Sequence, residues 1–389
     1  MTASILILLC VLLLLAYVFD ISASKTRVPA VILLLALGWG LRQLTNGLGV
    51  AVPEMQGTLP LLGTVGLILI VLEGSLELKV SRENAPEVRR AAVMAVLPLV
   101  VMAALLAWVF HALAGAPPLV AVTQAVPFAV ISSAIAIPTA KHFSAKDRSF
   151  VTYESSLSDI VGVMVFNFVA LNSEFGWGTF GHFGLELLII VAASFVGTLG
   201  LAFLLSRIHH HVKFAPIVIL TILIYAIAKA YHLPGLLVIM AFGMFLSNAS
   251  VLTEVRWLRF WRLDSLDSEV HRLKDLVAEG AFLVRSVFFL VFGFQIETAS
   301  LLEGDTWLWS LGICLAIVLV RWVFLKLMRI RPLPLLFIAP RGLVTVLLYL
   351  SIPAERAFPL VSPSMVTQVV LISSLMMMLG TLTARREQA

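Results

Sequence analysis

Residues 150–171 read FVTYESSLSDIVGVMVFNFVAL, and this stretch decides what kind of protein the sequence encodes. It is long enough to cross a bilayer as a helix, which takes about 20 mostly apolar residues. Two carboxylates, Glu154 and Asp159, and a run of serines interrupt its apolar positions. Because ionisable groups at membrane depth are costly unless they are paired or hydrated, we treat the segment as a candidate functional helix.

The composition of the whole chain agrees with a membrane location. Of 389 residues, 60% are apolar and 13% are charged, and the mean hydropathy is +1.04. Soluble domains are roughly 45–50% apolar and about 25% charged, so the composition excludes a soluble globular enzyme and predicts a polytopic membrane protein. Cys10 and Cys314 lie in apolar runs far apart, which argues against a disulfide framework.

Thirteen apolar segments are candidates for membrane spans, which predicts an all-α polytopic protein. They are residues 4–19, 29–44, 59–76, 91–113, 119–140, 150–171, 184–205, 214–230, 233–248, 276–296, 307–326, 332–352 and 362–383.

The distribution of Lys and Arg predicts the orientation in the membrane. Connections after odd-numbered segments, together with the C-terminal tail, hold 21 of the 27 basic residues, and connections after even-numbered segments hold three. Because cytoplasmic loops carry the basic excess, we expect the N-terminus outside and the C-terminus in the cytoplasm, in a bacterial inner membrane. Arg285, Arg321 and Arg341 fall inside apolar segments.

Helical spacing gathers the polar groups of residues 150–171 into one sector. At 100° per residue, Glu154 and Ser158 share one stripe, and Ser155 and Asp159 share its neighbour. Hard cations prefer carboxylate and hydroxyl oxygens, and a carboxylate in a low dielectric takes up a proton more readily than in water. A group that holds either ligand, but not both, can exchange one for the other. The alternative is a buried carboxylate that pairs with a membrane arginine.

Prolines interrupt two of the segments. The fifth has a proline on each side of Ser132 and Ser133, and the twelfth has three prolines just before Arg341. Prolines at mid-membrane free backbone groups, which is tolerated where they line a cavity. If the chain divides into six segments, one linker and six more, the interrupted segments take matching places in two repeats. Such matching interruptions indicate the binding site of a transporter.

These residues resemble the monovalent cation:proton antiporter superfamily, nearest its sodium/proton exchanger branch of the NhaP type, over essentially the whole chain. ESSLSD (154–159) is similar to the family's Glu-Ser-x-x-Asn-Asp motif, the most specific match. Three further segments resemble family motifs: LEGSLEL (72–78) resembles Phe-Glu-Gly-x-Leu-Glu-Leu, APRGLV (339–344) resembles Leu-Arg-Gly-Ala-Val, and FFLVFG (288–293) resembles Phe-Phe-x-x-x-Gly.

Two positions depart from the family pattern. Ser158 stands where the family has Asn, and Ser132-Ser133-Ala134 stands where it has Thr-Asp-Pro. The second departure is closer to the potassium-efflux and related branches, so the choice between sodium and potassium stays open.

The resemblance implies two inverted six-helix repeats, with the fifth and twelfth helices discontinuous and crossed. It also implies a homodimer, in which a dimerisation domain supports a mobile core domain. The division we expect is dimerisation helices in 1–90, core helices in 91–171, a linker helix in 172–213, dimerisation helices in 214–300, and core helices with a short tail in 301–389.

By the same resemblance, Asp159 is the carboxylate that binds cation and proton, Arg321 holds Glu154, and Arg341 supports the crossing. Glu73 is also consistent with a helix cap. The candidate ion-binding residues are Asp159, Glu154, Ser155, Ser158, Ser132 and Ser133, and the candidate ion-pair residues are Arg321, Arg341, Glu73 and Arg285.

The predicted function is therefore antiport of Na⁺ or Li⁺ against H⁺ by alternating access, with no enzymatic activity and no cofactor. Because Ser158 cannot ionise, and because Arg321 would keep Glu154 charged, we expect one proton per cation. A K⁺/H⁺ antiporter or a cation-coupled transporter is the main alternative. A channel is less favoured because TVGLI (64–68) lacks the TVGYG filter. An intramembrane aspartyl protease would need a second buried aspartate.

Two remaining features lie in predicted cytoplasmic connections. Residues 249–275 are basic and rich in Trp, which predicts a segment on the membrane surface rather than nucleic-acid binding. His209-His210-His211 is interpreted as a polar loop, with metal binding or pH sensing as alternatives. The expected partners are monovalent cations, protons, the lipid bilayer and a second copy of the chain.

Overall fold

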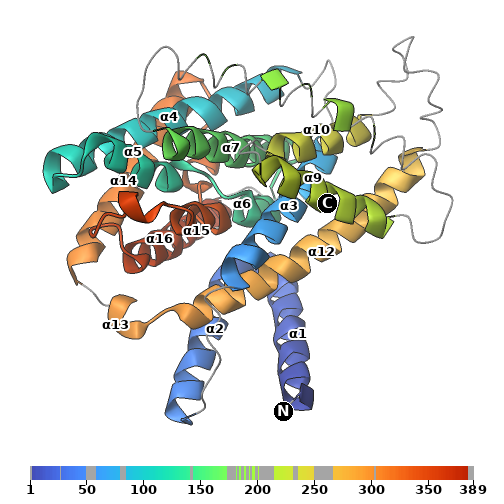
Figure 1. Ribbon diagram of the computed structural model, residues 1–389, viewed down its shortest axis with the longest axis horizontal. Helices are drawn as coiled ribbons and strands as arrows, with labels where there is room; N and C mark the ends of the chain where they lie inside the picture. The colour runs from blue at the N-terminus through green and yellow to red at the C-terminus, as the bar shows by residue number, and fades with distance from the viewer. Residues whose placement is uncertain are drawn as a thin grey trace.

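The protein is a bundle of helices (Figure 1). The computed structural model describes residues 2–26, 28–49, 58–78, 85–140, 143–172, 214–230, 235–248, 266–301 and 304–383, together with single positions between 181 and 200. Across these ranges the regular elements are α-helices and short 3₁₀ turns, without strands. The predicted all-α fold class is confirmed.

The helices follow the predicted order along the chain. Their bounds are α1 Thr2–Thr26, α2 Ala30–Gly47, α3 Thr58–Glu77, α4 Ala85–Ala114, α5 Pro118–Ala129, α6 Ser133–Ala140, α7 Ala145–Leu171, α9 Phe214–Ala230, α10 Gly235–Ser247, α12 Leu266–Gln295, α13 Thr298–Leu301, α14 Gly304–Leu327, α15 Leu343–Leu350 and α16 Pro363–Thr383, with 3₁₀ turns η3 Leu335–Phe337 and η4 Ala354–Arg356.

Twelve of the thirteen predicted segments coincide with described helices. Six helical stretches in the described ranges are long and apolar enough to cross a bilayer unaided. The seventh predicted segment, 184–205, lies mostly outside the described residues. The histidines at 209–211 and most of the connection 249–275 also lie outside them.

Three helices begin at least five residues earlier than predicted. α4, α7 and α12 start at Ala85, Ala145 and Leu266, so the exposed Arg90 and Lys146 belong to helices and not to loops. A helix of 30 residues such as α4 is about 45 Å long, whereas the hydrocarbon core is about 30 Å thick. The charged first turns can therefore extend into water, which is why apolar runs alone placed these boundaries wrongly.

The helices pack in two groups. One group contains α2, α3, α10 and α12, and the other contains α4, α5, α7, α14 and α16. α12 crosses α2 at Gly38, where an added Cβ would lie 2.8 Å from the backbone nitrogen of Phe294, so only glycine allows this approach. α3 bridges the groups, because it also contacts α6, α7 and α15.

Both predicted interruptions are present, but the first is not located at its prolines. The chain leaves helical geometry at residues 130–132, between α5 and α6, while Pro127 and Pro138 lie inside those helices. Ser133, which was expected in the break, is the first residue of α6. A proline removes the hydrogen bond to the carbonyl four residues earlier without fixing where the helix ends. The second break spans residues 338–342, between η3 and α15.

Candidate functional site

Asp159 lies in the middle of α7 and is completely buried. Its Oδ2 accepts hydrogen bonds from the Ser133 backbone N–H, at 3.2 Å, and from the Ser133 hydroxyl. Its Oδ1 has no hydrogen-bond partner among the described residues. One carboxylate oxygen is therefore held at the N-terminus of α6, where the helix dipole favours negative charge, and the other oxygen is left for a ligand.

The first break owes its shape to hydrogen bonds from three consecutive backbone N–H groups. The N–H of Ile131 donates to Ser158 Oγ at 3.0 Å, and the N–H of Ser132 donates to the carbonyl of Pro340 at 2.9 Å. The third N–H, that of Ser133, donates to Asp159. Unpaired backbone groups are costly in a membrane. Ser158 and Asp159 of α7 therefore stabilise the break between α5 and α6, because they accept hydrogen bonds from its N–H groups.

Glu154 forms an ion pair with Arg321, in the place that the resemblance implied. Arg321 Nη1 and Nη2 donate to the two carboxylate oxygens at 2.6 and 2.8 Å. Arg321 Nε donates to the carbonyl of Leu335 in η3, at 2.6 Å. Both side chains are at most 3% exposed. The sequence left open that a buried carboxylate pairs with a membrane arginine. This is true of Glu154, whereas Asp159 is hydrogen-bonded to Ser133.

Arg341 joins the two breaks. Its Nε donates to the carbonyl of Phe128 at 2.6 Å, and its Nη1 donates to the carbonyl of Ala339 at 3.0 Å. Its backbone N–H donates to Ser373 Oγ at 2.9 Å. The guanidinium thus binds the carbonyl of Phe128 at the C-terminal end of α5, where helix geometry leaves carbonyls unpaired and the dipole favours a cation, and the carbonyl of Ala339 in the second break.

The other predicted residues differ in how they are placed. Ser132 Oγ is buried without a hydrogen-bond partner in the described part of the chain. Ser155 donates its hydroxyl to the carbonyl of Val151 within α7, at 2.7 Å. Glu73 is half-buried near the end of α3, and its supporting role stays a prediction.

Arg285 does not form the predicted ion pair with any described residue. It is 7% exposed in α12, and neither a hydrogen bond nor a salt bridge connects it to the described ranges. Two buried carboxylates have other partners, because Glu154 pairs with Arg321 and Asp159 accepts hydrogen bonds from Ser133. The part of Arg285 in an ion pair stays a prediction.

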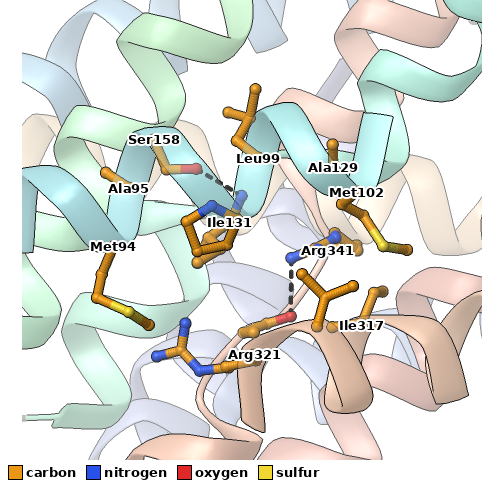
Figure 2. A pocket seen from close by; sticks show the side chains of 13 residues that line it. Met94, Ala95, Leu99, Met102, Ala129, Ile131, Ser158, Ile317, Arg321 and Arg341 are labelled. Carbon is orange, nitrogen blue, oxygen red and sulfur yellow. Dashed lines mark hydrogen bonds between the residues drawn. The ribbon is translucent and has the colours of Figure 1, made fainter. Parts of the chain in front are cut away.

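A small cavity lies beside the breaks (Figure 2). Its volume is about 20 Å³, enough for one water molecule. Ser158, Arg321 and Arg341 supply its polar wall, and apolar residues of α4, α14, the end of α5 and the two breaks supply the rest. Asp159 is not among the residues that line this cavity.

Comparison with known proteins identifies the family. Residues 10–385 match the family described as "Sodium/hydrogen exchanger, transmembrane". The chain belongs to this family. Membership confirms the predicted relationship to the sodium/proton exchangers, and it makes the protein an integral membrane transporter and not an enzyme.

Solved structures of the sodium/proton antiporter MjNhaP1 from Methanocaldococcus jannaschii share the fold of this exchanger. A structure at pH 8 is similar with a TM-score of 0.69 and 18% identity, covering 98% of this chain and 96% of that one. A second structure of MjNhaP1 gives a TM-score of 0.68 with 18% identity, covering 98% of this chain and 95% of that one. No curated protein sequence matches the chain.

The exchanger also has polar contacts that the sequence analysis missed. Arg356 in η4 donates to the carbonyls of Val169 and Asn172 at the end of α7, the second at 3.0 Å. Gln124 of α5 donates to the carbonyl of Arg356 at 2.7 Å. A buried polar residue inside an apolar run, such as Gln124, was the available signal. Ser373 in α16 is also a polar residue inside an apolar run, and its Oγ accepts the hydrogen bond from the backbone N–H of Arg341.

Proposed function

We propose that this exchanger carries out secondary antiport of Na⁺, or Li⁺, against H⁺, with the cation and the proton competing for Asp159. The observation that carries the proposal is the buried carboxylate of Asp159, in which one oxygen is hydrogen-bonded and the other has no partner in the described structure. A lone buried acceptor oxygen is costly until something binds it. Either a proton or a small cation can bind this oxygen. The two ligands compete, because one bound ligand prevents the other from binding.

The surrounding oxygens support a hard monovalent cation as the second ligand. Ser132 Oγ, in the same break, is also buried and unpartnered among the described residues. Carboxylate and hydroxyl oxygens are the ligands such cations prefer. Ser133 keeps Asp159 in place with two donated hydrogen bonds, so the remaining oxygen can change its ligand without losing its position.

The ion pair of Glu154 supports a stoichiometry of one proton per cation. Both of its carboxylate oxygens receive charge-assisted hydrogen bonds from Arg321. A carboxylate held in this way has no oxygen left for a transported proton. Ser158, next to Asp159, cannot ionise. One titrating carboxylate per transport cycle makes the exchange electroneutral.

The two groups of helices support alternating access by movement of one group against the other. In the proposed arrangement, residues 1–90 and 214–300 form the dimerisation domain of a homodimer, and residues 91–171 and 301–389 form the core that carries Asp159. The proposed orientation has the N-terminus outside and the C-terminus in the cytoplasm of a bacterial inner membrane. An empty, charged Asp159 is costly to move through hydrocarbon, so the core moves with a ligand bound.

The test is cation-induced proton release from purified protein in vesicles, compared across Li⁺, Na⁺, K⁺ and Rb⁺ at two pH values. Release with Na⁺ and Li⁺ is expected, and release with K⁺ alone would favour the K⁺/H⁺ alternative. Asp159→Asn is expected to abolish release, whereas Asp147→Asn, in the first turn of the same helix, is expected to leave it intact. Wild-type exchange in Asp159→Asn would overturn the proposal.

A further inference from the structure

Ser156 is a buried hydroxyl of α7 for which the ion-binding set above has no role. It is 2% exposed, and its Oγ has no hydrogen-bond partner among the described residues. Two neighbouring hydroxyls differ from it: Thr152 and Ser155 donate to the carbonyls of Arg148 and Val151, four residues earlier in the helix, at 2.9 and 2.7 Å. Ser156 therefore keeps a free oxygen where its neighbours have bonded to their own helix.

The surroundings of Ser156 make room for this oxygen. It lies beside Gly74 of α3: a Cβ added at Gly74 would be only 2.8 Å from Ser156 Oγ and 3.4 Å from Cδ1 of Ile137 in α6. The hydroxyl thus lies where α3, α6 and α7 meet (Figure 1). α3 belongs to the first group of helices and α7 to the second, so the hydroxyl lies between the groups that we propose to move.

The position along α7 places Ser156 before Asp159. The two residues are three apart, which is about 4.5 Å along the helix axis, and Ser156 is nearer the end of α7 predicted to face the cytoplasm. A cation that travels between that end and Asp159 must exchange its water ligands for protein oxygens along the way. An unbonded buried hydroxyl can provide such an oxygen.

We propose that Ser156 is a ligand for the transported monovalent cation. It would form a transient binding site between α3 and α7, on the cytoplasmic side of Asp159. The inference rests on the proposed function, because it assumes that Asp159 is the destination. Gly74 is the matching feature of α3, because a Cβ at this position would lie 2.8 Å from Ser156 Oγ and would crowd the hydroxyl.

The first experiment measures Na⁺-dependent proton release for Ser156→Ala in vesicles. Loss of one cation ligand is expected to raise the KM for Na⁺ by about tenfold, with Vmax within about twofold of wild type. Thr152→Val is the matched control, because its hydroxyl is bonded within the helix, and it is expected to keep the wild-type KM. An unchanged KM in Ser156→Ala would overturn the proposal.

A second variant tests direct contact with the cation. Ser156→Cys keeps the size of the side chain but replaces a hard oxygen by a soft sulfur, which favours soft ions. The ratio of KM values for Na⁺ and Tl⁺ is therefore expected to shift towards Tl⁺ by about tenfold. An unchanged ratio would overturn the proposal even if Ser156→Ala were inactive for another reason.

The two proposals fail separately. If Ser156 has no part in binding, both Ser156 variants keep wild-type constants while Asp159→Asn still abolishes release. If Asp159→Asn retains exchange, the proposed function fails. The assumption that a cation bound at Ser156 moves on to Asp159 then fails with it. Gly74→Ala provides a further check, because it is expected to raise the KM for Na⁺, and adding it to Ser156→Ala is expected to raise KM no further.

Discussion

Arg341 in the second break donates its Nε to the carbonyl oxygen of Phe128 in α5, across a distance of 2.6 Å. This bond connects two positions 213 residues apart in the chain. It also satisfies a carbonyl at the C-terminal end of α5, a group that is costly to leave unpaired in a membrane. Arg341 therefore links the two interrupted segments, together with the bond from the N–H of Ser132 to the carbonyl of Pro340.

Arg341→Met is expected to destabilise the exchanger. It leaves the carbonyls of Phe128 and Ala339 buried without their donor, and each such loss costs about 1–3 kcal/mol. The transition temperature in detergent should fall by several degrees, and exchange should be lost. Arg329→Met, outside the breaks, is the control. A variant as stable and active as wild type would contradict the role assigned to Arg341.

Glu154→Gln is expected to be more damaging than removal of the whole ion pair. The single change leaves the buried charge of Arg321 uncompensated, which typically costs about 3–5 kcal/mol. Combining Glu154→Leu with Arg321→Met replaces the pair by apolar groups of similar volume, and stability should recover substantially. The free energies of unfolding of Glu154→Leu, of Arg321→Met and of the double variant measure the coupling. Strictly additive losses would show that the pair is not coupled.

Transport is expected to be insensitive to the membrane potential. If Arg321 keeps Glu154 ionised, one proton returns for each cation and no net charge crosses. Rates of Na⁺/H⁺ exchange should therefore be equal in vesicles whose potential is clamped at different values with valinomycin and K⁺. A rate or driving force that follows the imposed potential would mean that a second group titrates during the cycle.

Ser158→Ala is expected to weaken the first break, because the N–H of Ile131 then loses its acceptor. The cost of a buried, unsatisfied N–H is about 1–3 kcal/mol. Ser158→Asn should be milder, since its side-chain oxygen can accept the same bond and the neighbouring cavity of about 20 Å³ offers space. Thermal stability and the KM for Na⁺ measure both effects. Equal losses in the two variants would contradict the acceptor role.

Several features of the fold were predictable because they depend on local composition. The thickness of a bilayer sets the length of an apolar run, so segments such as 214–230 coincide with their helix, α9. The same reasoning failed at the start of α12, because a helix continues into water where the apolar run does not. Asp159 was predictable as a candidate because a carboxylate inside such a run is rare.

The sequence by itself determined the helical segments and the few polar groups that they carry into the membrane. Only the tertiary structure decided what each polar group does. It paired Glu154 with an arginine 167 residues away, left Arg285 without an ion pair in the described part, and divided the N–H groups of the first break among α7 and the second break. These outcomes depend on contacts between distant parts of the chain, whose geometry is fixed only when the helices pack, whereas hydropathy acts at each residue separately.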